Sequence, residues 1–160
     1  MPIVIMSLDT NKVYLTKTGL ASLEEELLEL TKVKRTEVAL RIKSAREMGD
    51  ISENAEYDSA LQEQSFVEGR ILELEEILKV AQVAEDSIAG IVGVGSKVTV
   101  HIDGDEEVFH IVGAPEANPM DGKISHESPL GKALVGKKVG EKIEVEAPVG
   151  VLTYTVLNVE

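Results

Sequence analysis

From Thr16 to Ala84 the sequence contains no proline, and its apolar residues recur at alternating steps of three and four. That spacing is the a/d pattern of a coiled-coil seam, in which each apolar side chain faces a partner helix. Glu, Leu, Lys and Ala dominate this stretch, as expected for helices. The pattern therefore predicts amphipathic helices that need a partner to cover their apolar stripes.

The first helical segment begins with a regular seam that later shifts. Its early members are three, four and three residues apart: Leu20, Leu23, Leu27 and Leu30. Continuing the same spacing beyond Leu30 would place polar side chains in the seam, whereas the apolar residues of the following turns are Val33, Val38, Ile42 and Ala45. We therefore expect the seam to rotate or stutter in the middle of this helix.

The second helical segment keeps its seam, and only the glutamine is polar among Tyr57, Ala60, Gln64, Val67, Ile71, Leu74, Leu78 and Ala81. Between the segments lies Met48-Gly49-Asp50-Ile51-Ser52, in which Gly49 suits a chain reversal. Two amphipathic helices joined by so short a link lie antiparallel. We predict a coiled-coil hairpin over residues 9–86, about 45 Å long, with its tip at residues 49–56.

The chain changes character near residue 90, where Gly and Pro begin to recur and Val and Ile alternate with polar residues. Alternating runs predict strands at 97–102, 108–112, 141–147 and 151–159. Asp103-Gly104-Asp105 is typical of a hairpin turn. Ser128 and Pro129 predict a short helix that Gly136 ends. We expect an α+β chain whose second domain, 91–160, packs an antiparallel sheet on this helix.

The net charge of −13 restricts the partners of the chain. Duplex-binding proteins normally carry a basic excess, because phosphate neutralisation supplies their affinity. We therefore expect no sequence-specific DNA binding and no attraction to an anionic membrane. The sequence has no cysteine, which excludes a disulfide scaffold and a thiolate metal site. With no spanning stretch or signal segment recognised, we expect a cytoplasmic protein.

A local basic stripe lies in the first helix, within fifteen residues whose only acid is Glu37: Lys32, Lys34, Arg35, Arg41, Lys43 and Arg46. Offsets of three and eleven residues return several of these to one helix face. The pattern fits a solvated face stabilised by ion pairs. It also fits a surface for an anionic partner, and the pattern alone leaves both interpretations open.

The predicted tip holds four carboxylates within nine residues: Asp50, Glu53, Glu56 and Asp58. Stepping the second seam backward from Tyr57 reaches Glu53 and then Asp50. Acids at a helix start are favoured by the dipole and can act as caps. However, Mg²⁺ also prefers carboxylate oxygens, and two acids are enough to complete a site whose other ligands belong to another macromolecule.

The residues around the tip and two distant motifs resemble one known family. Around the tip these are Gly49-Asp50-Ile51-Ser52-Glu53-Asn54-Ala55-Glu56-Tyr57 and Phe66-Val67-Glu68-Gly69-Arg70-Ile71. The two distant motifs are Gly122-Lys123-Ile124-Ser125 and Ser128-Pro129-Leu130-Gly131-Lys132-Ala133-Leu134-Val135-Gly136-Lys137. From Tyr14 onward the chain resembles bacterial transcription elongation factors of the Gre family, the GreA type more than the strongly basic GreB type. The resemblance implies an N-terminal antiparallel coiled coil and a C-terminal FKBP-like domain.

The resemblance also implies a function. Members dock on RNA polymerase at the rim of its secondary channel through the C-terminal domain, here by Ser128, Pro129 and Leu130. The coiled coil enters the channel and stimulates cleavage of the nascent RNA 3′ end in backtracked complexes, so the chain would be an accessory factor and no enzyme itself. Asp50 and Glu53 would complete the second Mg²⁺ site of the polymerase, and Asn54 and Glu56 would support them.

Arg46 and Lys43 would contact the RNA, although Leu61 stands where relatives carry a second basic residue. The isolated chain would bind no metal. Three alternatives remain: a channel-binding inhibitor on the same scaffold, a coiled-coil interaction module, and a prolyl isomerase. The isomerase is disfavoured because residues 91–160 offer only Phe109 and Tyr154 for an aromatic pocket. The three histidines, His101, His110 and His126, show no metal-ligand spacing and are expected as strand or loop residues.

Overall fold

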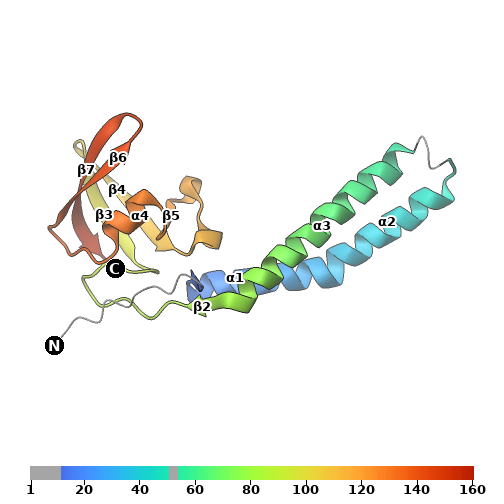
Figure 1. The fold of residues 1–160 in the computed structure, drawn as a ribbon, viewed down its shortest axis with the longest axis horizontal. Helices are drawn as coiled ribbons and strands as arrows, with labels where there is room; N and C mark the ends of the chain where they lie inside the picture. The colour runs from blue at the N-terminus through green and yellow to red at the C-terminus, as the bar shows by residue number, and fades with distance from the viewer. Residues whose placement is uncertain (1–11, 51–53) are drawn as a thin grey trace. The chain divides into compact units, whose positions relative to one another are not determined.

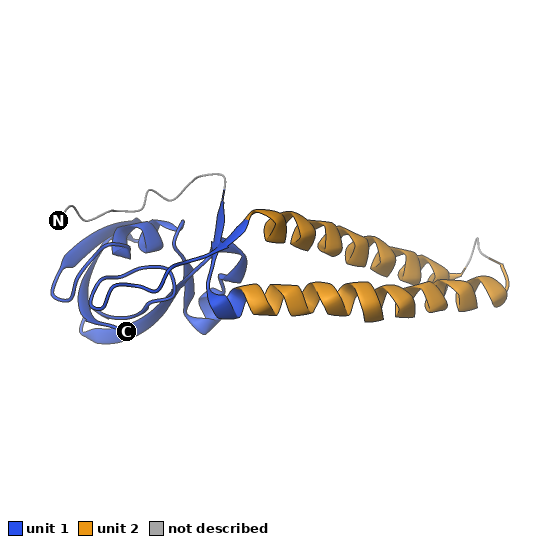
Figure 2. Cartoon of the chain, turned by 90° about the horizontal axis from the view of Figure 1, so that it is seen from below, with its two compact units in different colours: residues 1–19, 81–160 blue, residues 20–80 orange. Residues whose placement is uncertain are grey.

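The computed structural model describes residues 12–50 and 54–160 and divides into two compact units (Figure 2). One unit is helical and comprises residues 20–80. The other joins residues 12–19 to residues 81–160, whereas the sequence pattern divided the chain at 9–86 and 91–160. The difference arises because β1 (Val13–Leu15) pairs in parallel with β2 (Ala81–Val83). Ala81 therefore begins a strand and is not the last seam residue of a helix.

The helical hairpin expected from the sequence is confirmed. It consists of α1 (Lys17–Glu29), the π-helical segment η1 (Leu30–Lys34), α2 (Arg35–Glu47) and α3 (Ala55–Val80). α2 and α3 run side by side in opposite directions (Figure 1). The core between them contains Val38, Ile42, Ala60, Val67 and Ile71, all buried members of the two expected seams. Gln64, the polar seam member, is exposed.

The expected shift of the first seam occurs at η1. There the Arg35 N–H donates to the Leu30 carbonyl, five residues back, so the turn holds one residue more than an α-helical turn. A one-residue insertion moves the heptad positions 37, 41 and 44 to 38, 42 and 45. The residues at these shifted positions are buried, while Val33 is 46% exposed and lies outside the seam, contrary to the sequence-based expectation.

Deleting Val33 should leave the hairpin folded, because the deletion removes the residue that the π turn accommodates. Val38, Ile42 and Ala45 would then continue the heptad of Leu23 and Leu30 without a shift. We expect a melting temperature within about 3 °C of the parent by circular dichroism.

The matched control is deletion of Ala39, which lies outside the π turn. This deletion forces either Val38 or the pair Ile42 and Ala45 out of the seam, so the melting temperature should fall by about 5 °C or more. Equal losses for the two deletions would contradict the insertion account.

The second unit contains a five-stranded sheet in the order β5-β4-β3-β7-β6. The strands are β3 (Lys97–Ile102), β4 (Asp105–Val112), β5 (Lys123–Ser125), β6 (Lys142–Ala147) and β7 (Gly150–Val159). The four predicted strands are present and pair antiparallel. β5 was not predicted, and its parallel pairing with β4 makes the sheet mixed.

The hairpin turn between β3 and β4 follows from its two central residues. Asp103 and Gly104 have φ of 50° and 92°, and Ile102 pairs with Asp105. Positive φ at both positions is the type I′ geometry that suits the twist of a two-residue hairpin. The core of this unit is aliphatic except for one tyrosine: Val92, Val98, Val100, Ile111, Leu134, Ile143, Tyr154 and Val156.

Residues 12–19 belong to the sheet unit because a carboxylate and a buried leucine hold them there. Leu15 is fully buried. The Glu116 carboxylate accepts from the Thr16 N–H at 2.9 Å, from the Thr16 hydroxyl, and from the Gly113 N–H at 3.2 Å. A side chain at Gly19 would collide with that carboxylate.

No helix within the described ranges has the length and apolarity needed to cross a membrane.

Candidate functional site

The tip of the hairpin places Asp50 just beyond the end of a helix. α2 ends at Glu47, Gly49 turns the chain with a φ of 129°, and Asp50 is exposed and non-helical. The expectation that the second helical seam runs back through Glu53 to Asp50 is therefore wrong for Asp50, because α3 begins only at Ala55. Glu53 lies outside the described residues.

Asn54 connects the two helices at the tip. Its side-chain oxygen accepts from the Tyr57 N–H at 3.2 Å, which satisfies one of the free donors at the start of α3. Its side-chain nitrogen donates to the Ala45 carbonyl at 2.8 Å, near the end of α2. One half-buried amide therefore holds the end of one helix against the beginning of the other.

Arg41 makes a second connection just below the tip. Its Nε and Nη2 both donate to Glu56 Oε1, at 3.0 and 2.8 Å, and its Nη1 donates to Glu63. Glu56 and Glu63 are seven residues apart and so share one face of α3. The hydrogen bond with Glu56 is the main cause that raises the pKa of Arg41 above its ordinary value. Sequence reasoning missed this group, although the seven-residue spacing of the two acids was a usable signal.

The basic stripe divides into paired and unpaired members. Lys34 pairs with Glu37 at 3.3 Å, and Arg35 makes two parallel bonds to Glu68 at 2.7 and 2.8 Å. With Arg41, these pairs support the ion-pair interpretation for half of the stripe. The other three, Lys32, Lys43 and Arg46, form no ion pair within residues 12–50 and 54–160.

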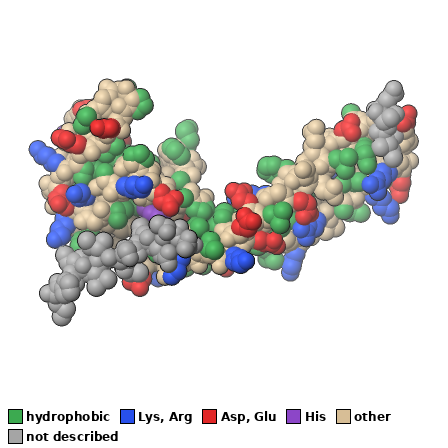
Figure 3. Space-filling view, in the orientation of Figure 1, with side chains coloured by type: hydrophobic (Ala, Val, Ile, Leu, Met, Phe, Trp, Pro, Cys, Tyr) green, Lys and Arg blue, Asp and Glu red, His purple; other side chains and the backbone are tan. Residues whose placement is uncertain are grey.

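The two expected RNA-contacting residues lie in the last turns of α2. Lys43 is exposed, and the guanidinium carbon of exposed Arg46 lies 5.8 Å from the centre of the Tyr57 ring. Leu61 packs half-buried against the hairpin core. Figure 3 shows basic and acidic side chains spread along the helical unit, including near its tip end. The exposed cations next to the tip leave a local surface that an anion can approach.

Ser128, Pro129 and Leu130 lie at the start of α4 (Pro129–Leu134), as the sequence predicted. The Ser128 hydroxyl accepts from the Gly131 N–H at 3.0 Å and donates to the Ser125 carbonyl at 2.7 Å. All three residues line a groove of 340 Å³, together with Ile124 and Val145 from β5 and β6. The walls are almost entirely apolar, so the groove suits an apolar side chain of a protein partner.

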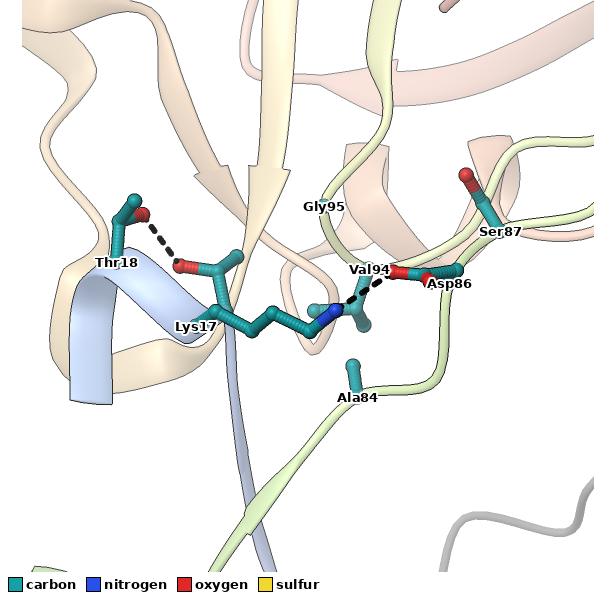
Figure 4. A pocket seen from close by; sticks show the side chains of 8 residues that line it. Lys17, Thr18, Ala84, Asp86, Ser87, Val94 and Gly95 are labelled. Atoms are coloured by element: carbon teal, nitrogen blue, oxygen red, sulfur yellow. Dashed lines mark hydrogen bonds and ion pairs between the residues drawn. The ribbon is translucent and has the colours of Figure 1, made fainter. Parts of the chain in front are cut away.

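A different pocket, of 260 Å³, lies beside the start of α1 (Figure 4). Lys17 and Asp86 face each other across it, with Nζ and Oδ1 3.2 Å apart, and the Thr16 and Thr18 hydroxyls are 3.1 Å apart. The lysine charge is already paired there. The described part of the chain contains no group of three His, Asp or Glu side chains able to hold a metal ion.

None of the three histidines lies at the tip or lines the groove beside Ser128. His126 is buried edge-on against Tyr14, with ring centres 6.1 Å apart, and burial lowers its pKa. His101 and His110 lie in β3 and β4, the sheet positions that the sequence predicted. Among the described surfaces, the tip and the groove are the two that carry the site residues predicted from the sequence.

Comparison with known proteins gives consistent matches over both units. A family model described as "Transcription elongation factor, N-terminal" matches residues 13–83, and one described as "Transcription elongation factor, GreA/GreB, C-term" matches residues 87–160. The chain is 53% identical to transcription elongation factor GreA of Acetivibrio thermocellus over 155 residues, covering 94% of this chain and 98% of the relative. It is 48% identical to GreA of Roseiflexus castenholzii over 151 residues, covering 92% and 96%.

Among solved structures, the crystal structure of GreA factor homolog 1 of Thermus thermophilus is 31% identical to this chain. The match covers 93% of this chain and 99% of that one, with a TM-score of 0.44.

Proposed function

Because the chain belongs to the GreA/GreB family of transcription elongation factors, we propose that it rescues backtracked RNA polymerase by stimulating cleavage of the nascent RNA 3′ end. RNA polymerase is the partner of an elongation factor. The observation that carries the finer proposal is the position of Asp50, an exposed carboxylate at the end of a hairpin whose helices are joined by Asn54 and Arg41. A hairpin of two helices suits delivery of a carboxylate into a channel of the polymerase.

The donor set at the tip fits Mg²⁺. The acids of the tip segment offer oxygen ligands, which hard cations prefer, and the described residues hold too few acids close together for a site of their own. Asp50 and Glu53 would therefore share Mg²⁺ with the polymerase. When bound, Mg²⁺ would lower the pKa of a water and stabilise charge on the reacting oxygens. Asp50 and Glu53 would orient that water, and the chain would remain an accessory factor to the polymerase's own hydrolysis.

The other exposed groups support this arrangement. Lys43 and Arg46 are exposed in the last turns of α2, next to the tip, where they would contact the phosphates of the extruded RNA. The apolar groove beside Ser128, Pro129 and Leu130 would dock on the polymerase at the rim of its secondary channel. Docking and chemistry are then assigned to different units of the chain.

The proposal is tested by adding the protein to halted, backtracked elongation complexes with Mg²⁺ and following release of RNA 3′ fragments. We expect release to accelerate and elongation to resume when nucleotides are added. A protein that only slows elongation would overturn cleavage stimulation in favour of channel-binding inhibition. A protein with no effect on the complexes, although bound to them, would overturn both.

A further inference from the structure

Arg41 is the one cation of the described hairpin whose guanidinium contacts two carboxylates of the opposite helix. Both carboxylates lie on α3, and one of them, Glu56, belongs to the acidic tip segment. The guanidinium is planar and rigid, so its hydrogen bonds fix the direction as well as the distance of the carboxylates that it contacts. We call Arg41, Glu56 and Glu63 the Arg41 clamp. It fixes the first turns of α3 against α2.

Hairpin stability alone does not account for the clamp. Its side chains are 39%, 56% and 39% exposed for Arg41, Glu56 and Glu63, and exposed ion pairs contribute little to stability in water. The buried core residues Val38, Ile42 and Ala60 already join the helices at this level. The particular effect of the clamp is orientational, because it acts on the turn that follows the tip.

The clamp also constrains the role of Glu56. Both guanidinium donors on that side of Arg41 converge on Glu56 Oε1, so the carboxylate is directed across the hairpin toward α2. A carboxylate held in this way is a poor candidate for a metal ligand, because the adjacent Arg41 guanidinium repels a cation and its two hydrogen bonds fix the direction of the carboxylate.

We propose that Arg41 and Glu56 are positioning residues that orient the acidic tip, and that Glu56 does not contact the metal. This inference rests on the proposed function, since it concerns how Asp50 and Glu53 are presented. Small displacements of catalytic groups reduce rates strongly, by up to about 100-fold per ångström. Loss of an exposed clamp should cost less, because Asn54 still joins the two helices.

The test compares Arg41→Ala, Glu56→Gln and the double variant in the backtracked-complex assay at saturating protein. We expect each single variant to lower the maximal cleavage rate about 5- to 10-fold, and the double variant to lower it no further. Non-additivity is the signature of two groups that act as one unit. Arg41→Lys should recover only part of the rate, because one ammonium cannot reproduce the fork.

The matched control is Glu68→Gln, which breaks the equivalent cross-hairpin pair with Arg35 farther from the tip. It should change cleavage less than 2-fold, and all variants should keep their affinity for polymerase. Equal loss in Glu68→Gln would overturn the proposal in favour of general hairpin loosening. Multiplying losses in the double variant would assign the two residues separate roles, such as RNA contact and metal contact.

Asp50→Ala in the same assay separates this proposal from the one on which it rests. If Asp50→Ala abolishes cleavage while Arg41→Ala is silent, only the clamp is wrong. If Asp50→Ala cleaves as well as the parent, the proposed function of the tip is wrong.

Discussion

Asp50→Ala should lower stimulated RNA cleavage by about 100-fold or more while leaving affinity for polymerase within about 2-fold. Removing a residue that only hydrogen-bonds to a metal ligand typically lowers metal affinity or activity about 10–100-fold. Removing a ligand itself should lower activity at least as much. Asp50 is exposed, so its replacement removes little packing and the melting temperature should stay unchanged. The measurement is single-turnover release of RNA from backtracked complexes, with affinity obtained by competition against the unlabelled parent.

Asp58→Ala is the matched control, because it removes an exposed acid of the same segment from the first turn of α3. Cleavage by this variant should stay within about 2-fold of the parent. Glu53→Gln should behave like Asp50→Ala and keep the size of the side chain. If higher Mg²⁺ restores cleavage to either variant, the lost group acts through the cation. Parent-like cleavage by Asp50→Ala at low Mg²⁺ would refute the site assignment.

The helices were predictable because each seam must bury a stripe of apolar side chains. The one-residue shift was also predictable, since Val38, Ile42 and Ala45 lie one position beyond a strict heptad. The π turn that produces the shift was not, because a seam pattern records which residues are buried and not how the backbone adjusts. For the same reason the apolar Val33 was wrongly placed in the seam and is exposed.

The elements missed from the sequence are short ones that depend on distant partners. β1, β2 and β5 have three residues each, too few to show an alternating pattern, and β1 finds its partner almost seventy residues away. The backward extension of the second helix failed at Asp50 because periodicity does not locate a helix start. Asn54 does so, through its bond to the Tyr57 N–H.

The candidate site was predictable only where residue type decides the chemistry. Clustered acids at a hairpin tip indicated an oxygen-ligand site before any geometry was known. The ion pairs of Arg35 and Arg41 depend on how α2 lies against α3. The basic stripe alone therefore could not distinguish a solvated, ion-paired face from a surface for an anionic partner. The groove beside Leu130 depends on Val145, a residue of β6 that no local motif connects to α4.

Gly131→Ala should destabilise the sheet domain, because a Cβ there would overlap the Ser125 carbonyl and lie 2.9 Å from the His126 Cα. These are backbone atoms of the last residue of β5 and of the residue after it, so they cannot move aside as a flexible side chain would. Overpacking of this kind costs about 1–3 kcal/mol, which exceeds the helix preference of alanine over glycine of about 1 kcal/mol. We expect a fall in melting temperature of about 3–8 °C by calorimetry.

Gly69→Ala is the opposite substitution and serves as its control. Gly69 lies inside α3, and a Cβ there would meet no atom within 4 Å, so alanine should raise the melting temperature by about 2–4 °C. If Gly131→Ala raised the melting temperature as Gly69→Ala is expected to, the close approach of α4 to the end of β5 would not determine stability.

The functional effect of Gly131→Ala follows from its position in α4. Pro129 and Leu130 lie in the same short helix, so pushing Gly131 away from Ser125 moves both out of the groove wall. Affinity for polymerase should then fall about 10-fold or more. The maximal cleavage rate at saturating protein should be unchanged, because the variant leaves Asp50 and the Arg41 clamp intact. A lower maximal rate with unchanged affinity would instead place the groove outside the docking surface.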